Sequence, residues 1–252
     1  GIISAMKEEI QALQKQLKIS KRIQKGMRTY YQGTLFDQEV VLVFSRWGKV
    51  ASATTVTQLI NDFDIDEIIF TGVAGAAQMH IHIGDLIIGE SLYQHDMDAS
   101  PLVAKFEIPL LGKNSFQTDP PSRLQMHAAT RKFMKEIDQH IPKTSLESLG
   151  IDSPNIHIGD IASGDQFVSS AEQLDIIMKQ LPGVLCVEME GAAVAQVCHE
   201  YQVPFTIIRT ISDLSNNNAH IDFPKFANEI ASQFALGIIR NYFKIKYTES
   251  KR

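Results

Sequence analysis

Apolar and polar positions along the chain repeat with two different periods, and together these periods predict strands interleaved with helices. The run GIISAM predicts a short buried strand, and the following KEEIQALQKQL places Ile10, Leu13 and Leu17 on one face of a helix. Farther along, EIIFTGVAGA predicts a buried strand that ends in a glycine turn, and SAEQLDIIMKQL predicts a helix with Ser170 as its N-cap. This alternation is typical of α/β folds, in which helices cover both faces of a mostly parallel or mixed sheet.

The other segments fit the same plan. TYYQGTLF and EVVLVFSRW predict a hairpin that turns at Asp37 and Gln38, and VASATTVTQLINDF predicts a helix. Further strands are predicted for GDLIIGESLYQHD, IHIGDIASGD, VLCV and FTIIRTI, and a long amphipathic helix for FPKFANEIASQFALGIIRNYFKI. A helix is predicted near residues 120–138, and irregular connections are predicted over 99–118 and 142–155, which contain prolines and lack a clear period.

Length, charge and the absence of a long apolar run limit the kinds of partner that this protein is expected to bind. The chain has 252 residues, of which 44% are hydrophobic and 21% charged, so it can fill one large core, and we expect a single domain over 1–252. The formal net charge of -5 argues against nucleic acid and anionic membranes as partners. No apolar run reaches the roughly 20 residues needed to span a bilayer. Small molecules or a second copy of the chain are therefore the expected partners.

Two residue types bear on redox chemistry and on metals. Cys186 and Cys198 lie in apolar surroundings without a CxxC motif, which is typical of buried thiols in a reducing compartment and favours a cytoplasmic protein. His80 and His82 alternate in HIH, but no third ligand accompanies them at metal-binding spacing, so no metal site is predicted. The chain begins at Gly1 inside an apolar run, which leaves open whether a segment precedes it.

Carboxylates, hydroxyls and glycines gather where the predicted strands end. Carboxylates are costly to bury unpaired, and ligands of α/β folds bind at the carboxyl ends of strands, so we expect one pocket there. The strand-end residues are Glu8 and Glu9, residues 72–75, residues 164–167, Met189 and Glu190, and Ser212 and Asp213.

Three of these carboxyl groups suit the cleavage of an N-glycosidic bond. Such a reaction needs an acid for the leaving base, a group that binds the ribose and a positioned water. We predict that burial raises the pKa of Asp213 so that it acts as the acid. Glu190, at a helix start, is expected to be held anionic by the helix dipole and to accept hydrogen bonds from ribose hydroxyls, while Glu9 orients water. Singly, each residue also suits an ordinary capping role.

Five motifs occur in a characteristic order: GIISAMKEE, FTGVAGA, IASGDQFV, VEMEGAAVAQVC and RTISD. They resemble those of the methylthioadenosine/S-adenosylhomocysteine nucleosidases of the purine nucleoside phosphorylase superfamily, and the resemblance runs from Gly1 to about residue 245. It implies a nucleoside phosphorylase-like, three-layer α/β/α sandwich with a mixed central sheet, a homodimer and no cofactor. It also implies hydrolysis of methylthioadenosine and S-adenosylhomocysteine to adenine and the thio-ribose.

The resemblance assigns roles at the matching positions. Asp213 would protonate adenine N7, Glu9 would handle the water, and Met189 with Glu190 would bind the ribose. Arg209 would help to order the water site.

Further roles follow for residues around the base and the 5′ group. Phe167 would stack on adenine, and the backbone of Val168 would bond its edge. Ser212 would support Asp213, and Phe223 would lie along the 5′-thio substituent. Glu188 belongs with the substrate-binding group, although its position favours a peripheral or surface partner over a catalytic residue.

Two departures and one unmatched segment affect these assignments. Val73 stands where many relatives have Ser, so a hydroxyl near the water is missing, although the backbone N–H is retained. The chain reads SRWGK where SGIGK is common, so Trp47 would place an indole near the ribose and the 5′ side and alter substrate preference. Residues 99–118, which in the family help to complete the neighbouring subunit's site, match too poorly to transfer roles.

Two alternatives to hydrolysis stay open. Phosphorolysis would need a cationic anion site, and related phosphorylases carry Arg and Ser where this chain has Phe70 and Val73, although Arg46 and Arg209 would still be available. A non-catalytic nucleoside-binding protein would keep Phe167 and a ribose carboxylate without needing all three carboxyl groups.

Overall fold

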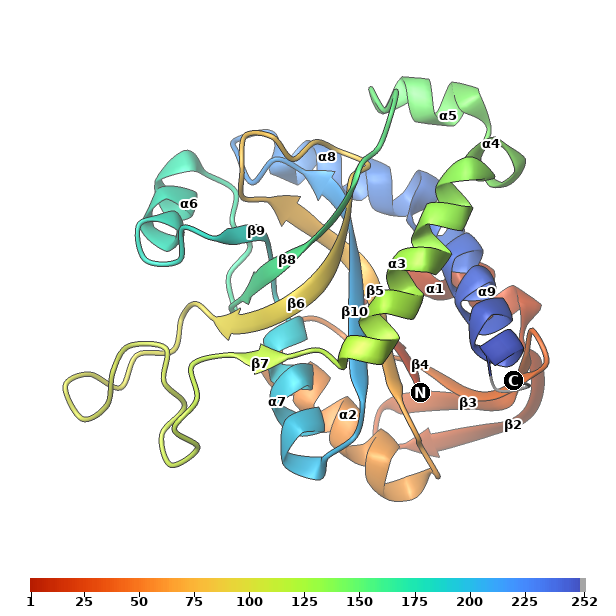
Figure 1. Ribbon diagram of the computed structural model, residues 1–252, viewed down its shortest axis with the longest axis horizontal. Coiled ribbons are helices and arrows are strands. Elements are labelled where there is room, and N and C mark those ends of the chain that lie inside the picture. Colours follow the sequence, from red (N-terminus) through yellow and green to blue (C-terminus); the bar gives the residue numbers. More distant parts are fainter. Residues whose placement is uncertain (250–252) are drawn as a thin grey trace.

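The computed structural model describes residues 1–249, and its centre is a mixed β-sheet with helices on both faces (Figure 1). The strands are β1 (Ile2–Ser4), β2 (Lys18–Lys25), β3 (Arg28–Leu35), β4 (Gln38–Phe44), β5 (Ile68–Ala76), β6 (Leu86–Gln94), β7 (Phe116–Gln117), β8 (Ile156–Ser163), β9 (Val184–Glu188) and β10 (Phe205–Asp213). They pair in the order β10-β6-β8-β9-β5-β1-β4-β3-β2, with β7 beside β6. The predicted α/β fold with a mixed sheet is confirmed.

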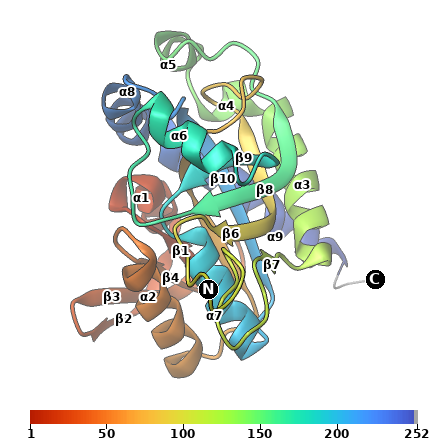
Figure 2. The ribbon, with the colours of Figure 1, turned by 90° about the vertical axis from the view of Figure 1, so that its left-hand side faces the viewer.

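Part of the sheet closes on itself. Strand β10 pairs in parallel with β5 and antiparallel with β6, so the pairings β5–β10–β6–β8–β9 return to β5. Figure 2 shows β6, β8, β9 and β10 curving around one another. This closure, which the sequence pattern did not predict, draws the carboxyl ends of β5, β8, β9 and β10 toward one another.

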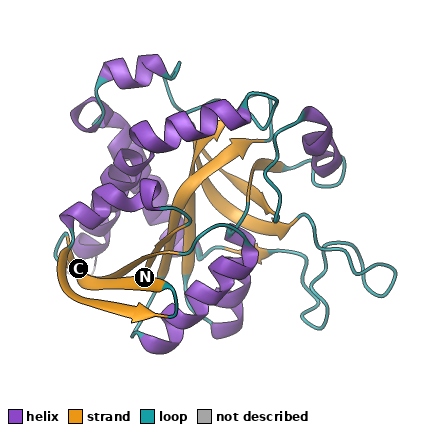
Figure 3. Ribbon diagram, turned by 180° about the vertical axis from the view of Figure 1, so that it is seen from behind, coloured by secondary structure: helices purple, strands orange, loops and turns teal. Residues whose placement is uncertain are grey.

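The helices form two layers (Figure 3). Helices α1 and α3 pack against α9 on one face of the sheet, and α2 packs against α7 on the other. The helices are α1 (Lys7–Gln16), α2 (Lys49–Asp62), α3 (Pro120–Lys135), α4 (Ile137–His140), α5 (Lys143–Ser148), α6 (Ala171–Met178), α7 (Gly191–Tyr201), α8 (Ala219–Phe226), the π-helix η1 (Ala227–Ala231) and α9 (Ser232–Glu249). Within residues 1–249, none has the length and apolarity needed to cross a membrane.

The apolar faces lie where their periods predicted them. Ile10, Leu13 and Leu17 are buried in the core between the sheet and helices α1, α3 and α9, and Ser170 Oγ accepts the Gln173 N–H to begin α6. All nine residues of β10 are buried, because helices cover both faces of this strand.

Several element boundaries differ from the prediction. Strand β5 continues through its glycines to Ala76, because β10 and β9 pair with this end of it. The exposed edge strand β2 was not predicted, since its apolar residues are sparse. Phe36 and Asp37, both with positive φ, form the β3–β4 turn. A short helix, α5, and the short strand β7 lie within the two predicted connections, and the last helical run contains η1.

Candidate active site

One cavity of about 350 Å³ lies where the carboxyl ends of β1, β5, β8, β9 and β10 meet. All predicted site residues except Arg209 line it: Glu9, Trp47, Val73, Phe167, Val168, Glu188, Met189, Glu190, Ser212, Asp213 and Phe223. The closed arrangement of strands brings together residues that are more than 200 positions apart in the sequence, such as Glu9 and Asp213.

Glu9 is held in the cavity wall by the start of α1. Its Oε2 accepts hydrogen bonds from the Ala5 N–H (3.0 Å), the Met6 N–H (2.9 Å) and Ser4 Oγ, and its Oε1 accepts the Val73 N–H at 3.0 Å. Burial raises the pKa of Glu9, although these hydrogen bonds and the charge of Arg209 oppose the rise. Glu9 therefore both caps α1 and presents a rigid carboxyl group to the cavity, and Val73 contributes its backbone N–H as predicted.

Asp213 ends β10 and is 2% exposed. Its Oδ2 accepts Ser212 Oγ–H at 2.9 Å, and its Oδ1 accepts the Ser215 N–H at 2.9 Å. Burial raises its pKa, the two hydrogen bonds limit the rise, and the charge of Asp222 adds to it. The predicted direction of this pKa shift is confirmed.

Glycine is required beside Asp213. A Cβ at Gly75 would lie 2.8 Å from Asp213 Oδ1 and 2.2 Å from Ser215 Oγ. Ser215, whose N–H positions the carboxyl group, was not predicted from the sequence, and neither was the cavity-lining residue His220. Gln166 also lines the cavity and was expected there as part of residues 164–167, although the sequence assigned it no role. His220 lies after the RTISD motif, and its side-chain direction depends on the fold.

Glu190 occupies the N-cap position of α7, and its Oε1 accepts the Gly48 N–H at 2.8 Å. Burial, with the negative charge of Glu188 adding to it, raises the pKa of Glu190 to about 8. The prediction that the helix dipole keeps this group anionic is wrong for the free site. The carboxyl group is 6% exposed and lies close to a second carboxylate, and these effects outweigh the helix dipole.

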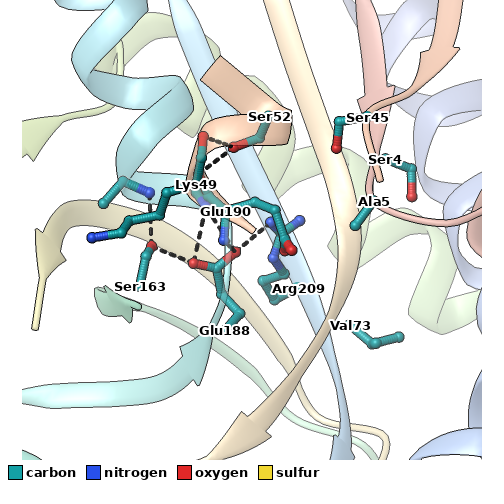
Figure 4. Close-up of polar contacts among 12 residues, drawn as sticks. Ser4, Ala5, Ser45, Lys49, Ser52, Val73, Ser163, Glu188, Glu190 and Arg209 are labelled. Atoms are coloured by element: carbon teal, nitrogen blue, oxygen red, sulfur yellow. Dashed lines mark hydrogen bonds and ion pairs between the residues drawn. The ribbon is translucent and has the colours of Figure 1, made fainter. Parts of the chain in front are cut away.

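Glu188 is buried rather than at the surface, so its predicted peripheral position is wrong. Its Oε2 pairs with Arg209 Nη2 at 2.7 Å, and its carboxylate also accepts hydrogen bonds from the Gly191 N–H, the Glu190 N–H and Ser163 Oγ. Figure 4 shows Glu188 lying between Ser163 and Arg209. Because β9 ends inside the closed ring of strands, Glu188 points inward, where Arg209 is its counter-ion.

Arg209 lies behind the cavity wall. The guanidinium is 1% exposed and stands over the Phe70 ring, with Cζ 4.1 Å from the ring centroid. Gly72 leaves room for it, since a Cβ there would lie 3.0 Å from Arg209 Nη1 and 2.8 Å from Glu9 Oε1. Arg209 therefore influences the cavity in two ways: it forms an ion pair with Glu188, and its positive charge opposes the rise in the pKa of Glu9.

Aromatic side chains form another part of the cavity lining, which we call the aromatic wall. The Phe167 and Phe223 rings lie 5.8 Å apart, and the Trp47 ring meets Phe223 edge-to-face at 6.1 Å. Trp47 remains 57% exposed and Phe167 40% exposed, although both line the cavity. A cavity lined by both exposed aromatic rings and carboxyl groups suits a flat, partly apolar ligand that also carries hydroxyl groups.

Residues 1–249 contain no group of three or more His, Cys, Asp or Glu side chains arranged to hold a metal ion. His82 instead lies beside Asp85, with Nδ1 3.8 Å from Oδ2. Cys186 and Cys198 are free, buried thiols, as predicted.

Comparison with known proteins identifies the family. The model of the phosphorylase superfamily matches residues 1–244. The chain is 35% identical to the 5′-methylthioadenosine/S-adenosylhomocysteine nucleosidase of Staphylococcus aureus strain bovine RF122 / ET3-1. The aligned region has 232 residues and covers 92% of this chain and 93% of that protein.

Solved structures of similar proteins agree with this match. The nucleosidase of S. pneumoniae with a transition-state inhibitor has a TM-score of 0.83 and 34% identity, covering 98% of both chains. The nucleosidase of Neisseria meningitidis in complex with methylthio-immucillin-A has a TM-score of 0.85 and 31% identity, covering 96% of this chain and 97% of that one. The chain described here belongs to the phosphorylase superfamily and, within it, to the 5′-methylthioadenosine/S-adenosylhomocysteine nucleosidases.

Proposed function

We propose that this protein hydrolyses the N-glycosidic bond of 5′-methylthioadenosine and S-adenosylhomocysteine, releasing adenine and the 5′-thio-ribose. The observation that carries the proposal is the convergence of Glu9, Glu190 and Asp213 on one cavity that aromatic side chains also line. A purine can stack on Phe167, and the carboxyl groups then lie around its ribose.

Asp213 is the general acid. Its raised pKa increases the fraction of the carboxyl group that is protonated, and this proton passes to adenine N7 as the bond between the base and C1′ breaks. Ser212 and the Ser215 N–H hold the carboxyl group in place and stabilise the carboxylate that remains.

Glu9 receives the proton of the attacking water, whose oxygen forms the new bond to C1′. Backbone N–H groups and Ser4 fix the orientation of its carboxylate, so little reorganisation accompanies the reaction. Glu190, with Met189 beside it, accepts hydrogen bonds from the ribose hydroxyls, and its ionised form stabilises the positive charge that develops on the sugar.

The cations of this chain argue against phosphorolysis. Among the described residues that line the cavity there is no Lys or Arg. Arg209 is paired with Glu188, and Arg46 is exposed and donates to the Met27 carbonyl at 3.0 Å. Phosphate would therefore lack the cationic site that it needs as a nucleophile.

The test is adenine release from methylthioadenosine by the purified protein, in phosphate-free buffer and again with added phosphate. Equal release in both buffers, with free thio-ribose as product, is expected. Release that requires phosphate would replace hydrolysis by phosphorolysis, and binding without release in either buffer would favour a nucleoside-binding protein.

We also propose a homodimer. The connection between β6 and β7 projects away from the sheet (Figure 1), and its Leu102 and Leu110 side chains are 89% and 104% exposed. Exposed apolar side chains on one segment are typical of an interaction surface. Light scattering coupled to size-exclusion chromatography should give twice the chain mass, and a monomer at micromolar concentration would contradict the proposal.

A further inference from the structure

The segment Ser45–Lys49 joins β4 to α2 along the edge of the cavity. Arg46 and Gly48 both have positive φ, at 76° and 93°. Glycine adopts this conformation readily, but for Arg46 it is energetically unfavourable. The segment contributes two groups to the site: the Gly48 N–H, which binds Glu190, and the Trp47 indole, which packs on Phe223. Its conformation must therefore be held by contacts from elsewhere in the fold.

Helix α2 begins without a capping side chain of its own. Its N-cap is Gly48, and its first turn contains no acidic residue. Asp165, which follows β8 and is 116 positions away in the sequence, instead accepts the Lys49 N–H on Oδ1 at 2.7 Å. A Cβ at Gly48 would lie 3.0 Å from that oxygen. Glycine therefore leaves room for a carboxylate to cap the positive end of the helix from another segment.

The Lys49 side chain completes a closed set of contacts. Its Nζ binds Asp96 Oδ1 at 2.5 Å and Gln94 Oε1 at 3.1 Å, and Asp96 Oδ2 accepts the Asp165 N–H at 2.9 Å. The Lys49 and Asp96 side chains are only 18% and 22% exposed, so water screens the pair less than a surface ion pair. Burial alone would raise the pKa of Asp96, but the hydrogen bonds from Lys49 and Asp165 lower it.

We propose that Lys49, Asp96 and Asp165 form a positioning clamp, which fixes the Ser45–Lys49 segment so that Gly48 binds Glu190 and Trp47 covers Phe223. The clamp ties together the starts of three segments: α2, the connection after β6 and the loop after β8, which also carries Phe167. Both a ribose-binding carboxyl group and both edges of the aromatic wall thus depend on the same three side chains, none of which lines the cavity. The effect of the clamp on ribose binding rests on the proposed nucleosidase function. Its effect on the conformation of the Ser45–Lys49 segment does not depend on that function.

Trp47 is the only tryptophan in the sequence, so its fluorescence reports the position of the segment in the free protein. We expect Lys49→Met and Asp96→Asn to shift the emission to longer wavelength. Quenching by acrylamide should increase, by at most about 1.8-fold because Trp47 as a whole residue is already 57% exposed. Lys143→Met, at an exposed position on α5, is the matched control and should leave both signals unchanged.

The second readout is steady-state kinetics with methylthioadenosine. Losing a helix cap and its linked contacts should lower kcat/KM by about fivefold to thirtyfold, mainly through KM, because Glu190 and Phe167 lose their fixed positions. Asp165→Asn keeps an acceptor for the Lys49 N–H and Lys49→Arg keeps the positive charge, so both should lose less than Asp165→Ala and Lys49→Met. Thermal melting of each variant verifies that it is folded.

Two results would overturn the proposal. In the first, Lys49→Met and Asp96→Asn are folded and have the same Trp47 emission and acrylamide quenching as the unmodified protein. This result would show that the three residues do not hold the segment. Altered fluorescence with unchanged KM would show that the segment does not position the site. If the unmodified protein releases no adenine, the nucleosidase function fails, and the fluorescence comparison still decides whether the clamp exists.

Discussion

Protonation of Glu190 should control how the stability of this protein depends on pH. Its carboxyl group has an ordinary pKa of 4.5 and a pKa of about 8 in the folded chain, because it is buried beside Glu188. The fold thus favours the neutral form. The stability contributed by Glu190 is complete below pH 4.5 and is lost progressively as the pH rises through 8.

The size of the effect follows from the same shift. One pKa unit corresponds to about 1.4 kcal/mol, and integrating over the pH range from 6 to 8 gives a loss of about 2 kcal/mol in the free energy of unfolding. For a protein of this length, 1 kcal/mol changes Tm by roughly 2–4 °C. Between pH 6 and pH 8, Glu190 should therefore lower Tm by about 4–8 °C.

The assay is differential scanning fluorimetry of the ligand-free protein and of Glu190→Gln across this pH range. Gln keeps an acceptor for the Gly48 N–H but cannot ionise, so its Tm should fall less steeply with pH. Asp213 also has a raised pKa and contributes equally to both proteins, so the difference between the curves reports Glu190 together with its charge interaction with Glu9. Glu147→Gln, at an exposed position on α5, is the control.

Parallel curves for the unmodified protein and Glu190→Gln would refute this reasoning. They would mean that Glu190 is ionised in the free site throughout the range, as the helix dipole alone would favour.

Three further changes test the chemistry. Asp213→Asn removes the proton donor at constant size, so kcat should fall by about 10²–10⁴-fold while nucleoside binding persists; activity within a few-fold of the unmodified enzyme would disprove the acid assignment. Glu9→Gln should lower kcat with little change in KM, whereas an effect confined to KM would make Glu9 a binding or structural group. Gly75→Ala should lower both Tm and kcat, because its Cβ would lie 2.8 Å from Asp213 Oδ1; a variant with unchanged Tm and kinetics would show that the site yields without cost.

Local patterns in the sequence predicted most of the elements, although not β2, β7 or α5, and they placed several carboxyl groups at the edge of one pocket. The period of α1 buried Ile10 and Leu13, and carboxyl groups placed directly after apolar strands marked Glu9 and Asp213 as members of one pocket. These inferences succeed because strand and helix periods are local, and because the carboxyl ends of strands in α/β folds share an edge.

The charge state of Glu190 and the supporting contacts were decided only by the tertiary structure. Glu188 became the buried partner of Arg209, and burial beside that carboxylate outweighed the helix dipole at Glu190. A pKa depends on which groups surround a side chain in space, and a cap such as Asp165 on Lys49 joins residues that are 116 positions apart. No local period encodes such a contact; it exists only because the sheet closes and brings these strand ends into one place.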